Sequence, residues 1–65
     1  MTREEIKKRI EHIESVSGDY EAAHSLEDSL RADFIQHIAD LGGAFAENAK
    51  LVLTTDKIDF KRYTA

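Results

Sequence analysis

The sequence predicts an all-α fold, a small antiparallel helical bundle of three helices with a short C-terminal helix or turn. Two observations predict it. Apolar residues recur every three or four positions through most of the chain, and no segment alternates apolar with polar residues long enough to form a strand. The connections expected near the glycines are short, which favours antiparallel neighbours. We expect residues 1–65 to form a single helical domain.

The first helix is expected at about residues 3–16. Thr2 and Glu5 have the spacing of a capping box, in which the hydroxyl accepts a free amide of the first turn. Isoleucine and valine then recur at helical spacing, at Ile6, Ile10, Ile13 and Val16. Gly18 is expected to end this segment in a left-handed conformation.

The second helix is expected at about residues 20–41, between a cap at Asp19 and the pair Gly42–Gly43. Its apolar positions follow in steps of three and four: Tyr20, Ala23, Leu26, Leu30, Phe34, Ile38 and Leu41. Ser25 and the two acids after it could also cap a helix, so a break at Ser25 is an alternative. The unbroken helix is favoured because the apolar period continues through that point.

The third helix is expected at about residues 44–53, where Phe45, Ala49, Val52 and Leu53 share one face. Three residues that favour helix caps follow, at Thr54, Thr55 and Asp56. We expect a short final turn or helix to begin there and to carry Ile58, Phe60 and Tyr63.

Three residues of the second helix depart from its apolar pattern. At about 100° per residue, Glu27 and His37 lie within about 40° of Ala23, inside the apolar stripe expected to face the core. Ile35 lies about 120° away, on the flank. Either the first and third helices cover this flank, or Ile35 contributes to self-association, which would also stabilise so short a chain.

The charge distribution argues against nucleic acid as a partner. The net charge is −4, and residues 19–40 carry six acids against Arg31 alone. Binding to phosphates depends on lysine and arginine, so a partner of this surface is expected to be a protein, more basic than acidic. No apolar run reaches the length of a membrane span, and the charged first residues do not resemble a signal peptide. We therefore expect a cytoplasmic protein without membrane contact.

His24, Glu27 and Asp28 form the one cluster with recognisable chemistry. Spacings of three and four on a helix bring an imidazole and two carboxylates together, which could bind a divalent metal ion. The alternative is local capping and hydrogen bonding, with Glu27 paired to Arg62 or Tyr63. Catalysis is not expected, because the only nearby nucleophiles are Ser25 and Ser29 and no glycine-rich phosphate loop is present.

Two blocks of the sequence resemble a family of short bacterial and bacteriophage proteins. The first is Ala22-Ala23-His24-Ser25-x-Glu27-Asp28-x-Leu30, and the second is Leu53-Thr54-Thr55-x-x-Ile58-Asp59-Phe60-x-Arg62-Tyr63. The family pattern has tryptophan where this chain has Tyr63. No activity is established for the family, so the resemblance implies only a bacterial or phage setting and a location. The shared residues are His24, Ser25, Glu27, Asp28, Asp59, Phe60, Arg62 and Tyr63, and a pair between Arg62 and Glu27 or Asp28 would connect the two blocks.

Taken together, the sequence predicts a small non-catalytic protein–protein interaction or accessory module that needs no cofactor. Its partner is expected to be a second copy or another protein, bound through the acidic surface of the second helix and the Ile35 flank. The alternative function is a metal-binding or hydrolytic unit that uses His24, Glu27 and Asp28. The number of copies and the biological process are not specified by these patterns.

Overall fold

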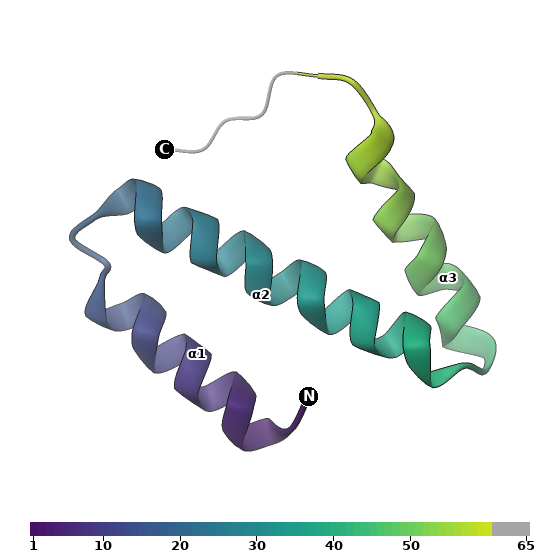
Figure 1. The fold of residues 1–65 in the computed structure, drawn as a ribbon, viewed down its shortest axis with the longest axis horizontal. Helices are drawn as coiled ribbons and strands as arrows, with labels where there is room; N and C mark the ends of the chain where they lie inside the picture. The colour runs from purple at the N-terminus through teal and green to yellow at the C-terminus, as the bar shows by residue number, and fades with distance from the viewer. Residues whose placement is uncertain (61–65) are drawn as a thin grey trace.

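The computed structural model describes residues 1–60, which form three α-helices and one short 3₁₀-helix (Figure 1). The helices are α1 (Arg3–Ser15), α2 (Tyr20–Leu41), α3 (Ala44–Leu53) and the 3₁₀-helix η1 (Thr54–Lys57). No strand occurs among these 60 residues. The all-α prediction is confirmed, and the three predicted helices agree with the observed bounds to within one residue.

Both predicted N-caps are present. The Thr2 hydroxyl accepts the backbone N–H of Glu5 at 3.1 Å, and the Asp19 carboxylate accepts that of Ala22 at 3.1 Å. Each side chain therefore satisfies one of the amides that lack a partner in the first turn of a helix. The helix that begins after Asp19 continues through Ser25 without interruption, so the alternative break at that residue is wrong.

The C-terminal ends of α1 and α2 differ in backbone conformation, and the prediction of a left-handed residue at Gly18 is wrong. α1 ends at Ser15, and the N–H of Val16 donates to carbonyls of the preceding turn. The N–H of Asp19 then donates to the Val16 carbonyl at 2.9 Å, so the chain turns without a left-handed residue. By contrast, the backbones of Gly42 and Gly43 have φ of 78° and 90°, a region that glycine adopts at little cost.

The helices lie in one flat layer. α2 is in the middle, with α1 along one side in the opposite direction and α3 on the other side (Figure 1). The Cα atoms extend 38 × 34 × 10 Å, and within residues 1–60 α1 and α3 are not in contact. The predicted closed bundle is therefore not confirmed, because in a bundle of three helices each helix packs on both others.

Burial is confined to the junction of α2 with α3. Among residues 1–60 the buried side chains are three alanines, Ala39, Ala46 and Ala49. No residue of α1 is buried, and its contacts with α2 include the Arg9 guanidinium, which donates to Asp33 at 2.8 Å. Large apolar side chains supply most of the free energy gained by burial. Because only alanines are buried here, the described residues form only a small hydrophobic core.

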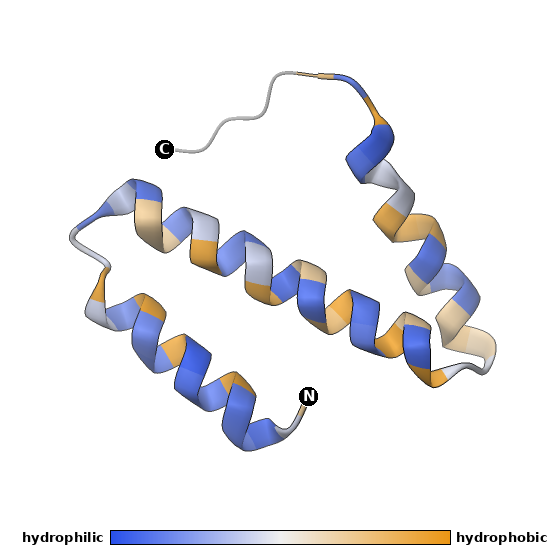
Figure 2. Ribbon diagram, in the orientation of Figure 1, coloured by the Kyte–Doolittle hydropathy of each residue, from blue (hydrophilic) through white to orange (hydrophobic). Residues whose placement is uncertain are grey.

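Hydrophilic residues interrupt the hydrophobic ones on every helix (Figure 2). Within the described part of the chain, no helix combines the length and the hydropathy that crossing a membrane requires. The predicted final turn begins as expected, as η1, but it ends at Lys57, so Ile58 and Phe60 follow it instead of lying on it, and Tyr63 is outside the described residues. The hydroxyls of Thr54 and Thr55 donate back to the carbonyls of Leu51 and Val52, so these threonines continue the end of α3 rather than cap a new helix.

Candidate functional site

One side of α2 is covered by neither neighbouring helix. Asp33 and His37 mark the side next to α1, where Asp33 binds Arg9 and the His37 ring lies 3.1 Å from the Met1 amino nitrogen. Ala39 marks the side packed on α3. At about 100° per residue, an arc of about 80° between these two sides holds seven residues, which we call the open face: Tyr20, Ala23, Glu27, Arg31, Phe34, Ile38 and Leu41.

The open face combines exposed apolar side chains with the ion pair of Glu27 and Arg31, and the opposite face of α2 is polar. Tyr20, Phe34 and Leu41 are 76%, 44% and 67% exposed. On the opposite face lie Ser25, Ser29 and Gln36, which are also exposed. Exposed polar groups remain hydrated at no cost, whereas exposed apolar groups of this size are stabilised by a covering partner. Of these two faces of α2, the open face is the one with exposed apolar side chains.

A shallow apolar groove of about 460 Å³ extends the open face toward α1. Ile6 of α1 lines it together with four residues of α2: Leu30, Arg31, Phe34 and Ile35. Phe34 belongs to both the groove and the open face, so the two form one surface. Concave apolar surfaces next to an aromatic side chain are typical anchor sites for another protein.

For Ile35 the structure supports the alternative in which a neighbouring helix covers its flank of α2, and that helix is α3. Ile35 is half-buried and lines a second groove together with Val52 and Leu53. The reason is that α3 packs on this flank of α2. The exposed apolar residue at this level is instead Phe34, its neighbour in the sequence.

Glu27 and His37 also lie in different surroundings from those expected. The Glu27 side chain is 47% exposed and pairs with Arg31 one turn later, at 3.5 Å. Its predicted partners Arg62 and Tyr63 lie outside the described residues. The pairing with Arg31 was missed, although the spacing of four residues indicates such pairs on a helix. His37 is half-buried beside Met1, so it faces α1 instead of a central core.

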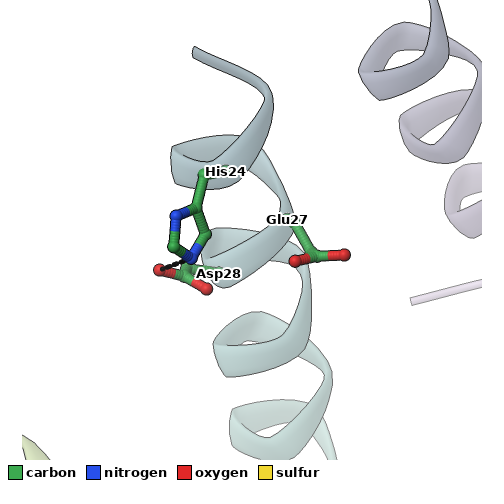
Figure 3. A group of neighbouring side chains, drawn as sticks. All are labelled: His24, Glu27 and Asp28. Carbon is green, nitrogen blue, oxygen red and sulfur yellow. Dashed lines mark ion pairs between the residues drawn. The ribbon is translucent and has the colours of Figure 1, made fainter. Parts of the chain in front are cut away.

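His24, Glu27 and Asp28 lie together near the start of α2. Nε2 of His24 is 3.5 Å from Oδ2 of Asp28, and one ligand atom from each of the three residues lies within 4.8 Å of the others. In Figure 3 the His24 ring and the Asp28 carboxylate point toward each other, and the Glu27 carboxylate lies apart from this pair. Tetrahedral zinc needs ligand atoms about 3.3 Å apart, so side-chain rotation would have to draw Glu27 inward, away from Arg31.

The remaining predicted residues do not add to this cluster. Ser25 is exposed on the polar face, about 100° around the helix from His24. Asp59 and Phe60 follow η1 and are exposed, Phe60 at 55%. The predicted pair between Arg62 and Glu27 or Asp28 involves a residue outside the described part of the chain.

Comparison of the chain with protein-family models, with curated proteins and with solved structures finds no match. The resemblance to short bacterial and bacteriophage proteins therefore stays a prediction. The function has to be argued from the charge, the exposure and the contacts described above.

Proposed function

We propose that this chain is a small non-catalytic interaction module, bacterial or phage in origin and cytoplasmic, that associates with a second copy of itself. The observation that supports the proposal is the open face of α2, where Tyr20, Phe34 and Leu41 are exposed while the described residues bury only alanines. Two layers joined through this face would complete an antiparallel helical bundle that one copy leaves open. Folding and association would then depend on the same apolar surface.

A protein partner fits this surface better than a nucleic acid. The six acids of residues 19–40 against one arginine would repel phosphates. A groove lined by Ile6, Leu30 and Phe34 instead offers the apolar contacts and the aromatic anchor that protein interfaces use.

Sedimentation equilibrium over a range of protein concentrations tests the proposal. We expect a dimer or larger species whose population falls on dilution. Phe34→Glu is expected to shift the population strongly toward monomer, because a charge replaces an aromatic ring within the proposed interface. Ser29→Glu is the matched control, since it adds the same charge to an exposed position on the polar face of the same helix.

Circular dichroism of each variant shows whether its helices are retained, so a loss of association can be separated from a loss of folding. A wild-type chain that stays monomeric and helical at every concentration contradicts the proposal. Equal effects of Phe34→Glu and Ser29→Glu would contradict an interface on the open face.

A second candidate function is metal binding, favoured by the proximity of ligand atoms from His24, Glu27 and Asp28. An imidazole with two carboxylates suits zinc and similar divalent ions. The three side chains remain substantially exposed, which favours weak rather than tight binding.

Thermal melting with and without zinc tests this second candidate. Binding to the folded state raises the melting temperature by mass action, so zinc at about 100 times its dissociation constant would add about 2.7 kcal/mol of stability. His24→Ala should abolish this increase, and His12→Ala, which removes an exposed histidine of α1, should leave it unchanged. No shift with zinc, or equal loss in both variants, argues against a site at His24.

A further inference from the structure

We infer that two copies pair through antiparallel α2 helices, with Glu27 of each copy against Arg31 of the other. This inference rests on the proposed self-association and adds to it the direction and the register of the two helices. It follows from three features of the described residues: the charge of α2, the spacing of residues along it and the flatness of the layer.

Charge decides the direction. Arg31 is the one lysine or arginine among residues 19–40, against six acids, and it lies on the open face with its side chain 72% exposed. A parallel pair of α2 helices in register would place Glu27 against Glu27 and Arg31 against Arg31. An antiparallel pair centred between these two positions places each Glu27 against the opposite Arg31. Complementary charge therefore favours the antiparallel arrangement.

The Glu27–Arg31 contact and the spacing of residues along α2 together set the register of the two helices. One line of residues along α2 runs through Tyr20, His24, Glu27, Arg31, Phe34 and Ile38, in alternating steps of four and three. Tyr20, Arg31 and Phe34 are exposed, and the other three are half-buried. Alternating steps of this kind keep two helices in contact over their length. In the register that joins Glu27 to Arg31, His24 lies opposite Phe34 of the second copy, and Tyr20 lies opposite Ile38. An imidazole can stack on an aromatic ring, and a tyrosine ring can pack on an isoleucine, so neither pair obstructs this register.

The shape of the layer permits this contact. The Cα atoms span only 10 Å in the thinnest direction, so α1 and α3 lie beside α2 and not above its open face. A second flat layer can approach α2 directly. At the centre of the contact, the intrahelical pair of Glu27 with Arg31 at 3.5 Å would meet its symmetry copy and form a ring of four alternating charges.

Charge reversal tests the contact. Glu27→Arg and Arg31→Glu are each expected to raise the dimer dissociation constant about tenfold or more, because like charges then face each other. The double variant restores opposite charges across the pair and should regain most of the affinity. Glu21→Arg is the matched control, an exposed acid of α2 outside the open face, and should have a small effect. A double variant as weak as the single ones overturns the inference.

Disulfide capture tests the direction, and the chain offers a clean background because it contains no cysteine. Chains with Tyr20→Cys, mixed with chains with Ile38→Cys, are expected to form a disulfide-linked pair under mild oxidation, whereas Tyr20→Cys alone should not. Efficient linkage of Tyr20→Cys to itself indicates parallel helices and overturns the inference. So does absence of linkage in chains that sedimentation shows to be dimeric. A monomer by sedimentation overturns the proposed function as well.

Discussion

Asp19 is the residue at which the turn after α1 becomes α2. Its N–H donates to the Val16 carbonyl, its own carbonyl accepts the N–H of Ala23, and its carboxylate accepts the N–H of Ala22. All three contacts are local in sequence. This is why the cap could be predicted without any knowledge of the tertiary structure.

Removal of this cap should destabilise the helix by a measurable amount. Asp19→Ala is expected to lower the free energy of unfolding by about 1 kcal/mol, since an amide of the first turn loses its acceptor. Asp19→Asn retains a side-chain oxygen at the same place and is expected to lose much less. Chemical denaturation of the three proteins at one concentration measures the difference, and equal losses in both variants would contradict the role of the side-chain oxygen.

Residues that act across the chain were harder to predict than those that act locally. The contact of Arg9 with Asp33 joins residues 24 positions apart, and no pattern in the sequence indicates it. Glu27 pairs with Arg31, a contact the sequence analysis did not predict, and its predicted pairing with Arg62 or Tyr63 lies outside the described residues. The single-residue predictions that are confirmed are the two helix caps, whose partner lies three residues away.

At the level of elements, the connection between α2 and α3 depends on two consecutive glycines. Gly42 has φ of 78° with ψ of −178°, and Gly43 has φ of 90° with ψ of −174°. Residues with a Cβ atom avoid this combination. The pair therefore sets the angle at which α3 leaves α2 and brings Ala46 and Ala49 against Ala39.

The two connections should respond differently to the same substitution. Gly43→Ala is expected to cost about 1–3 kcal/mol, the range for a residue forced into a sparsely populated conformation. Gly18→Ala is expected to be neutral or slightly stabilising, because Gly18 has no positive φ and a Cβ atom there meets nothing within 4 Å. Melting temperatures of the two variants at one concentration provide the comparison, and a larger loss at Gly18 would contradict it.

For the whole molecule, the arrangement of exposed and buried residues affects stability more than any single contact does. One copy places its apolar residues along a thin layer and buries only small side chains. Small domains need a further source of stability, such as disulfides, metals or a partner. The chain has no cysteine, and the three candidate metal ligands are largely exposed, which is why the proposed function assigns this role to an apolar partner surface.

The sequence by itself determined the helices, their caps at Thr2 and Asp19, and the end of α2 at Gly42, because each depends on neighbours in the chain. Only the tertiary structure decided which sides of α2 are covered. The wheel predicted contact along the stripe through Glu27 and Phe34, but α1 and α3 pack on the flanks and leave much of it open. The physical reason is that α3 approaches α2 through alanines, whose small side chains allow close packing but add little to the hydrophobic period that a sequence displays.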